Sequence, residues 1–393
     1  MALLPLFASY ASGIPGFSLA DVILVLFTMC ALLKIGARDN NRMLGNIGAL
    51  YIGIALILLF DVIAVTSNKG ALYDVSIRTI RYCFYVFCFI YTSKKLIDVE
   101  MLKKCVKNVS VLATIYIILQ YVMYHVFDKV LNGFLPWLEL YIEDYGTKDY
   151  ESIYEAMFRP TSFFLEPAHF ARYAIIGLII ILWAKDLKIK DMFFAVFVSV
   201  GVLISTSSLG YLLLAMVWVS FALTRLVKIK KSWAKLCMIL AVLIAPVALY
   251  VIFQLPYVQD TIMRSLSGDI NDTNTAIGAR LNGFSHFAEL SIFGKIFGVG
   301  FGCIPEGAWL SSAAYWLYGS GIIVFSVYLV FLLSSLLRLK NEKKMILLIM
   351  FFLFFSDDSF YSYMCIIYYS LSLLTERVSY EKDPVYSDGI KVG

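Results

Sequence analysis

A chain of 393 residues that is 61% hydrophobic and only 16% charged has more apolar side chains than a compact soluble core can bury. Its solvent must therefore be, in large part, the hydrocarbon of a bilayer. The formal net charge of +5 does not indicate nucleic-acid binding, because the basic residues sit in short turns and form no stripe or recognition helix. We predict no nucleic-acid partner.

Apolar runs with few charges recur along the chain, and a single membrane crossing needs about 20 such residues. We predict an all-α, polytopic integral membrane helical bundle with about 10–12 transmembrane helices, forming a single domain over residues 1–393. The runs are 17–33, 44–66, 77–93, 108–127, 163–184, 192–206, 208–224, 234–254, 312–337 and 345–373.

The N-terminal segment MALLPLFASYASGIPGF is apolar but contains two prolines and two glycines. No charged region precedes the first span and no small-residue cleavage site follows it. We therefore interpret that span as retained rather than as a signal peptide. The segment before it is either an interfacial segment on the outer side or part of an additional span.

Lys and Arg are distributed unequally among the loops that join these runs. Five short loops together carry 20 Lys or Arg against 6 acids, whereas residues 128–158 and 255–310 carry 5 against 12. Because cytoplasmic loops retain positive charge, we predict two large extracytoplasmic loops, at 128–160 and 255–310. The short, cytoplasmic loops are 34–42, 93–107, 185–191, 225–235 and 338–344.

The first outer loop interleaves aromatic and acidic residues, with Trp137, Tyr141 and Tyr145 close to Glu139 and Glu143. One interpretation is an amphipathic helix lying at the membrane interface, with its aromatic rings at headgroup level. The other is a carbohydrate surface, since aromatic faces pack against sugars and carboxylates accept their hydroxyl hydrogen bonds. The two interpretations are compatible.

Ionisable residues gather in FRPTSFFLEPAHFARY, residues 158–173, at the start of an apolar run. Pro167 suits the first turn of a helix, which makes Glu166 the expected N-cap and places His169 and Arg172 in the first two turns. A helix N-terminus favours an anion. These residues predict two roles. A carboxylate accepts a proton, and cations, including Arg159, stabilise a phosphate leaving group.

A plainer alternative exists for the same motif. Glu166 can simply cap the helix and pair with Arg159 or Arg172, and Arg172 alone can anchor the helix at the headgroups.

The second outer loop contains GARLNGFSHFAEL, which predicts a short helix with Arg280, Phe284 and Phe287 on one face and His286 on another. It continues into FGVGFG at residues 297–302. That run lacks the strand, helix and Lys that a phosphate loop requires, so we predict a tight turn.

Charges also occur inside or at the ends of the apolar runs. Asp357 and Asp358 interrupt the last run, and a carboxylate inside a span is a functional candidate because its burial is costly. Arg78 and Arg81 begin the third run, where they either reach the outer headgroups or bind a lipid diphosphate. Asp21 and Asp61 lie near span ends and are expected to be solvated or paired.

The seven cysteines are scattered and indicate no disulfide framework. Cys83 and Cys88 have no nearby His or second Cys pair, and are interpreted as small buried hydrophobes. We predict neither a metal site nor a cofactor.

Four segments, in this order, resemble the Wzy-type polymerases of O-antigen and capsular repeat units, which are relatives of the O-antigen ligases. They are RPTSFFLEPAHFARY, STSSLGYLLLA, GARLNGFSHF and FGVGFG, and the R-P-x-S-F-F-x-E-P run is the most specific. The resemblance implies a metal-independent membrane glycosyltransferase on the outer face of the bacterial inner membrane. Such an enzyme moves a growing glycan from one undecaprenyl diphosphate onto the next lipid-linked repeat.

The resemblance also implies roles for individual residues. Glu166, Arg159 and Arg280 become catalytic, with Glu166 activating the acceptor hydroxyl and the arginines stabilising the diphosphate. The predicted substrate-binding residues are His169, Arg172, His286 and Asp357, of which Asp357 is a candidate because it is a carboxylate inside an apolar run. Family members often carry an arginine in the Ser-rich stretch, whereas STSSLG at 205–210 has none and is interpreted as a polar turn.

Two alternative functions remain open at this point. One is an O-antigen ligase that transfers glycan to lipid A core, and the other is a lipid-linked oligosaccharide flippase or transporter. The implied partners are the undecaprenyl-diphosphate-linked oligosaccharide and membrane lipid, with a chain-length regulator and a flippase as candidate protein partners.

Overall fold

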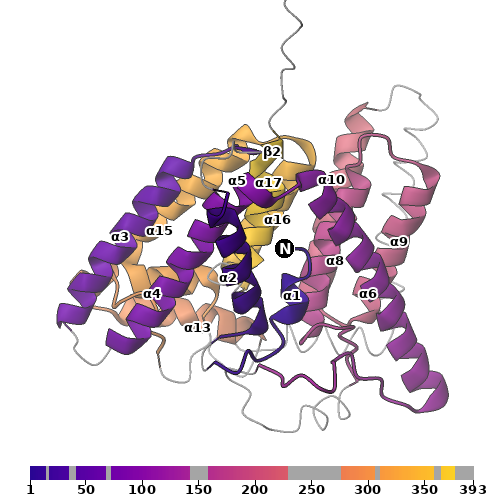
Figure 1. Ribbon diagram of the computed structural model, residues 1–393, viewed down its shortest axis with the longest axis horizontal. Helices are drawn as coiled ribbons and strands as arrows, with labels where there is room; N and C mark the ends of the chain where they lie inside the picture. The colour runs from indigo at the N-terminus through magenta and orange to yellow at the C-terminus, as the bar shows by residue number, and fades with distance from the viewer. Residues whose placement is uncertain are drawn as a thin grey trace, which may run out of the picture.

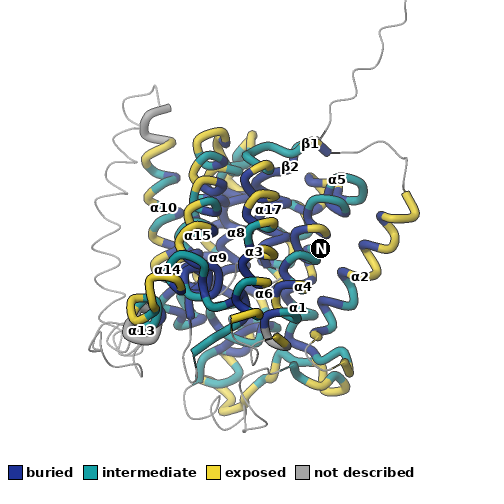
Figure 2. Tube along the Cα trace, turned by 90° about the vertical axis from the view of Figure 1, so that its left-hand side faces the viewer, coloured by how far each residue is buried: buried dark blue, intermediate teal, exposed yellow. Residues whose placement is uncertain are grey.

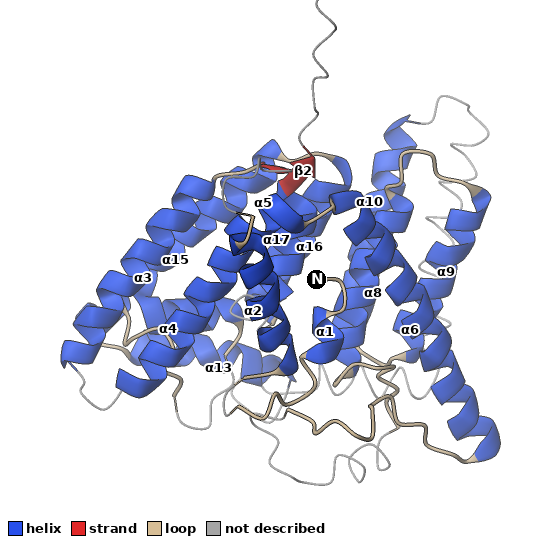
Figure 3. Ribbon diagram, in the orientation of Figure 1, coloured by secondary structure: helices blue, strands red, loops and turns tan. Residues whose placement is uncertain are grey.

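The computed structural model describes residues 1–14, 17–34, 41–67, 72–141, 158–228, 276–305, 310–357 and 364–376, and most of these residues are helical (Figure 1; Figure 3). Two short strands, β1 (Asn41–Met43) and β2 (Leu374–Glu376), form an antiparallel pair. The helices are α1 (Leu4–Phe7), α2 (Leu19–Leu32), α3 (Ile47–Ser67), α4 (Leu72–Phe87), its π-helical continuation η2 (Cys88–Thr92), α5 (Ser93–Leu96), α6 (Val99–Phe127), α8 (Pro167–Leu182), α9 (Ile189–Ile204), α10 (Ser208–Lys228), α13 (Ala276–Glu289), α14 (Ile292–Phe297), α15 (Ser312–Arg338), α16 (Asn341–Ser356) and α17 (Met364–Leu373).

Among the described residues, three helices, α3, α6 and α15, are long and apolar enough to cross a membrane. The same part of the chain holds four shorter apolar helices: α2, α8, α17 and the apolar part of α10. Large apolar side chains also cover the outside of the bundle, such as Ile52 and Val62 on α3, which are 57% and 62% exposed. Such a surface is stable in lipid and costly in water. The predicted all-α membrane bundle is confirmed at this level.

Helix α8 is the most deeply buried element around the FRPTSFFLEPAHFARY motif, residues 158–173. All of its residues from Phe170 to Leu182 are buried, which suits a helix that is apolar on every side. It packs against α6, α9, α10 and α16. In Figure 2, by contrast, outer helices such as α2 carry exposed residues, drawn in yellow. The missing side chain at Gly177 lets α8 approach Ser110 of α6, where a Cβ would lie only 2.2 Å from the serine Oγ. Helix α8 is therefore packed closely against α6 at this point.

The apolar run 345–373, predicted as one span, instead folds into two helices. Helix α16 ends at Asp357, whose backbone is extended at φ −153° and ψ 168°, and α17 begins at Met364. Lys343 near the start of α16 donates a hydrogen bond to the carbonyl of Leu374 just after α17, so the two helices return to the same end. The carboxylate breaks the apolar run and forms the tip of a helical hairpin.

The bundle has two ends with different contents (Figure 1). The end that we call the basic end carries α5, the β1–β2 pair and the turns at 183–188 and 338–341. The opposite end, called the motif end, carries residues 128–141, residues 158–166 and the first turns of α8. The start of the FRPTSFFLEPAHFARY motif and residues 128–141 of the first outer loop therefore share one end of the bundle.

The N-terminal segment begins in the middle of the bundle, where Figure 1 marks the N-terminus, and reaches the first outer loop at the motif end; it forms no additional span within residues 1–14. The Tyr173 hydroxyl of α8 donates to the Ala2 carbonyl at 2.8 Å. The Ala11 N–H donates to the Glu139 carbonyl at 2.9 Å, and the Tyr141 N–H donates to the Ser9 carbonyl at the same distance. The segment thus ties the first outer loop to α8.

The FGVGFG run is a tight turn packed on α15, as predicted. The N–H of Gly300 donates to the Gly319 carbonyl at 2.9 Å, beside a kink of α15 at Gly321, where φ is +73°. Gly298 has a φ of +79°, and a Cβ there would lie 2.1 Å from the Gly319 carbonyl oxygen. Only glycine combines this backbone conformation with this close approach.

We expect Gly298→Ala to lower the free energy of unfolding by more than Gly13→Ala. Gly13 also has a positive φ, +78°, but a Cβ there would meet nothing within 4 Å. The control therefore carries only the backbone cost, about 1 kcal/mol, whereas Gly298→Ala adds the displacement of α15, about 1–3 kcal/mol more. Thermal unfolding in detergent measures both, and equal losses would show that the turn is not packed on α15.

Candidate functional site

The segment before α8 is attached to α6 by one buried side chain, Gln120. The Gln120 Oε1 accepts the Ser162 N–H at 2.8 Å, and its Nε2 donates to the Leu131 carbonyl at 3.0 Å. The Ser162 hydroxyl donates to the Ala113 carbonyl at 2.9 Å. These bonds hold Ser162 at a φ of +59°, a conformation that needs such support in a non-glycine residue. The path of the RPTSFF segment is therefore set by α6.

The first outer loop also lies directly against this segment. A Cβ at Gly133 would meet the Ser162 carbonyl oxygen at 1.7 Å, so the two backbones are in contact. Phe158 stacks on Tyr124 of α6, with ring centroids 3.9 Å apart and planes 1° from parallel. Arg159, which follows Phe158, is half-buried beside these contacts.

Glu166 occupies the N-cap position of α8 and Pro167 its first helical position, as predicted. The Glu166 side chain, however, makes no capping hydrogen bond to the helix, so Glu166 occupies the N-cap position through its backbone alone. Glu166 and His169 are both half-buried, and each has polar or electrostatic partners in the structure. The carboxylate is thus not consumed by the helix terminus, where the dipole favours an anion.

Arg172, in the second turn of α8, forms an ion pair with Asp357 at the tip of the α16–α17 hairpin. The side chains are only 4% and 12% exposed, so both charges have lost most of their hydration. Ser312 at the start of α15 donates to the Asp357 carbonyl from its N–H at 2.8 Å and from its hydroxyl at 2.6 Å. Two residues that the sequence singled out separately are therefore partners, and Arg172 is not a headgroup anchor.

Helix α13 approaches the same region through α15. A Cβ at Gly283 would lie 2.7 Å from the Cβ of Ala314, two residues after Ser312. Arg280 lies one helical turn before Gly283, so its backbone belongs to the motif end, while its side chain is outside the described part of the structure. His286 is half-buried, with its Nδ1 4.0 Å from the carboxylate of Glu289.

Asp358 lies outside the described residues, as does the acidic part of the first outer loop at 142–157.

The STSSLG stretch is a polar turn between α9 and α10, as predicted. The Ser207 hydroxyl accepts the Gly210 N–H at 3.1 Å. A Cβ at Gly210 would lie 2.7 Å from that of Ala171, the neighbour of Arg172. The turn therefore packs against the first turns of α8 and contributes no cation there.

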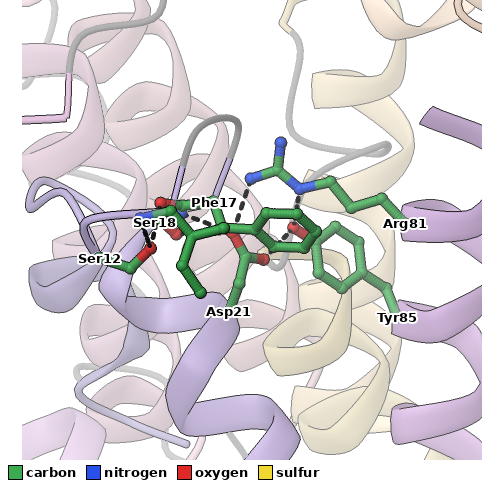
Figure 4. Close-up of polar contacts among 7 residues, drawn as sticks. Ser12, Phe17, Ser18, Asp21, Arg81 and Tyr85 are labelled. Carbon is green, nitrogen blue, oxygen red and sulfur yellow. Dashed lines mark hydrogen bonds and ion pairs between the residues drawn. The ribbon is translucent and has the colours of Figure 1, made fainter. Parts of the chain in front are cut away.

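A second buried charge network joins α2 and α4 (Figure 4). The Asp21 carboxylate accepts from Arg81 Nη2 at 2.7 Å, from the Tyr85 hydroxyl at 2.5 Å and from the Ser18 N–H at 2.9 Å. Arg81 Nε also donates to the Tyr85 hydroxyl at 2.7 Å. Arg81 is thus engaged by protein, and Asp21 is paired rather than solvated.

Asp61 of α3 forms a third buried polar centre, at the glycine-rich turn. Its carboxylate accepts the Phe301 N–H at 2.7 Å and a short hydrogen bond from the Thr79 hydroxyl of α4. Thr79 also lies 3.3 Å from the Phe301 carbonyl. Neither network was predicted in detail, because only the isolated acids inside apolar runs signalled them.

These helices and buried charges define a helical membrane protein whose ionisable motif residues gather at one end of the bundle. Comparison with protein-family models gives no match for this chain, and comparison with curated proteins gives none either.

Proposed function

We propose that this chain is an integral membrane glycosyltransferase. It polymerises undecaprenyl-diphosphate-linked oligosaccharide repeats into O-antigen or capsular polysaccharide at the outer face of the bacterial inner membrane. The observation that carries the proposal is the arrangement at the motif end. Glu166 and His169 lie at the N-terminus of α8, and Arg159 lies on a segment that Ser162 holds against α6. The sequence resemblance of this motif to Wzy-type polymerases supplies the reaction.

In this mechanism Glu166 accepts the proton of an acceptor sugar hydroxyl on one lipid-linked repeat. The hydroxyl oxygen forms a bond to the anomeric carbon of the donor glycan. The bond from that carbon to the diphosphate breaks, and undecaprenyl diphosphate leaves with the electron pair. This single displacement inverts the anomeric configuration.

The cations of the motif end act on the diphosphate. Arg159 and Arg280 bind it and stabilise the charge that develops as it leaves. The partial positive charge of the α8 N-terminus adds to this stabilisation. His169 and His286 orient the two lipid-linked substrates.

We assign a positioning role to Arg172 and Asp357. A guanidinium that is 4% exposed and already paired has little capacity left for a second anion. Through Asp357 and Ser312 the pair joins α8 to the hairpin tip and to α15, which carries α13. The pair thereby keeps the positions of Glu166 on α8 and of Arg280 on α13 fixed relative to each other.

The proposed topology has about 10–12 spans, with the motif end outside and the basic end in the cytoplasm. The Lys- and Arg-rich loops then face the cytoplasm, as is usual for the loops of membrane proteins. The motif end meets the substrate on the side of the membrane where no nucleotide donor is available.

The test is incubation of the purified protein with a single defined lipid-linked repeat, followed by separation of the glycans on a gel. A polymerase produces a ladder spaced by one repeat without any other acceptor. A product that appears only after lipid A core is added would indicate a ligase. Movement of the repeat across a proteoliposome membrane with no ladder would indicate a flippase, and either result would overturn the proposal.

A further inference from the structure

A groove opens at the basic end of the bundle, far from the motif end. Its volume is about 730 Å³, and it lies where α8 ends, between α10 and the first turns of α16. Trp183 and Lys185 line it from the end of α8, Thr224 from α10, and Lys344 from α16. A volume of this size is in the range, about 300–1,000 Å³, that holds small amphipathic ligands.

The lining of the groove has two kinds of chemistry. Lys185 and Lys344 supply two cations, and the Asn341 amide supplies hydrogen-bond donors. The Thr224 hydroxyl beside them already donates to the Ser220 and Phe221 carbonyls, each at 2.9 Å. Leu223, Met345 and Leu348 supply an apolar wall. A ligand that fits both parts has an anionic, hydrogen-bonding head and a hydrocarbon tail.

The two lysines are available to an anion. Among the residues that the structure describes, neither Lys185 nor Lys344 forms an ion pair. Glu342, the nearest acid along α16, is engaged by Lys103 of α6 at 2.9 Å. Asp186 follows Lys185 in sequence but is not among the lining residues.

The position of the groove also points to lipid. Trp183 is half-buried two residues before Lys185, and tryptophan and lysine concentrate at the level of lipid headgroups. Lysines near a membrane surface attract anionic lipids in particular. The exposed side chain of Leu223 lies on α10, one helical turn from Ser220 and two from Met216.

We propose that this groove binds one anionic phospholipid. The phosphate lies between Lys185 and Lys344, the Asn341 amide donates to its oxygens, and the acyl chains lie along Leu223 and Leu348. The site is separate from the proposed transfer reaction, since it lies at the opposite end of α8.

The experiment is native mass spectrometry of the purified protein titrated with phosphatidylglycerol. We expect one tightly bound lipid, and weaker binding of phosphatidylcholine. Lys185→Gln with Lys344→Gln should weaken phosphatidylglycerol binding by about 30-fold, or about fivefold for each lysine near an anionic headgroup. The matched control is Lys188→Gln with Lys340→Gln, which removes the same charge from the same two turns outside the groove.

A second variant tests the groove itself and keeps both lysines. Leu223→Trp fills the apolar wall at a residue that is 60% exposed, so the fold tolerates it, and we expect it to reduce lipid occupancy as well. Equal weakening by the control pair would overturn the proposal in favour of diffuse attraction to the basic loops. Displacement of the lipid by millimolar inorganic phosphate, or equal affinity for phosphatidylcholine, would also overturn it.

Discussion

Replacing Glu166 with glutamine should slow polymer formation by about 10²- to 10⁴-fold, because the amide keeps the size of the carboxylate but cannot accept the acceptor's proton. The substitution should leave the fold intact. Glu166 makes no side-chain cap, and the start of α8 is set by Pro167 and by the Ser162 contacts with α6. The rate of ladder formation from a defined lipid-linked repeat measures the effect.

The matched control is Glu139→Gln on the first outer loop, which makes the same charge change at an exposed residue of the motif end. The Glu139 contact that ties it to Ala11 uses its backbone carbonyl, which the substitution keeps. We expect polymer formation near the wild-type rate. Full activity of Glu166→Gln at normal protein level would remove Glu166 from the mechanism.

Breaking the Arg172–Asp357 pair should be the most destabilising single change in the described part of the bundle. Arg172→Met leaves a buried carboxylate without its cation, and Asp357→Leu leaves a buried guanidinium, so each should cost about 3–5 kcal/mol of unfolding free energy. The double variant replaces both charges with apolar groups and should recover most of that loss. Unfolding in detergent compares the three proteins.

Glu100→Gln provides the comparison for an exposed pair. Glu100 is 69% exposed where it meets Lys103 at 2.7 Å, and such pairs contribute at most about 1 kcal/mol. An equal loss in Arg172→Met and Glu100→Gln would contradict the buried-pair interpretation. The folded double variant also separates the roles of Arg172, since a positioning role predicts retained polymer formation and direct diphosphate binding predicts its loss.

The helices could be located from the sequence because apolar runs without charge have one stable arrangement in lipid. The runs 44–66, 108–127 and 312–337 correspond to α3, α6 and α15, and the helix of Arg280 and the turn at FGVGFG were also predicted. The start of α8 followed from Pro167, whose fixed φ and missing N–H suit a first helical turn. Local chemistry was sufficient for each of these features.

The structure of the last apolar run, residues 345–373, could not be predicted from local sequence. Hydropathy alone describes 345–373 as one span, because the two apolar halves of a hairpin look like one long helix. Whether Asp357 sits within a helix or ends one depends on what can pair with it, and its partner lies 185 residues away. A buried carboxylate at a hairpin tip is stable only beside that guanidinium.

The candidate site divides in the same way. The residue types of RPTSFFLEPAHFARY indicated anion chemistry at a helix start, and that inference needed only the motif and the helix dipole. The tertiary structure decided that Gln120 holds Ser162, that Arg172 pairs with Asp357, and that Gly283 seats α13 on α15. These contacts join residues from 31 to 185 positions apart, and no periodicity or spacing encodes them. Burial supplies the reason, since a polar group removed from water must find its partner wherever packing places it.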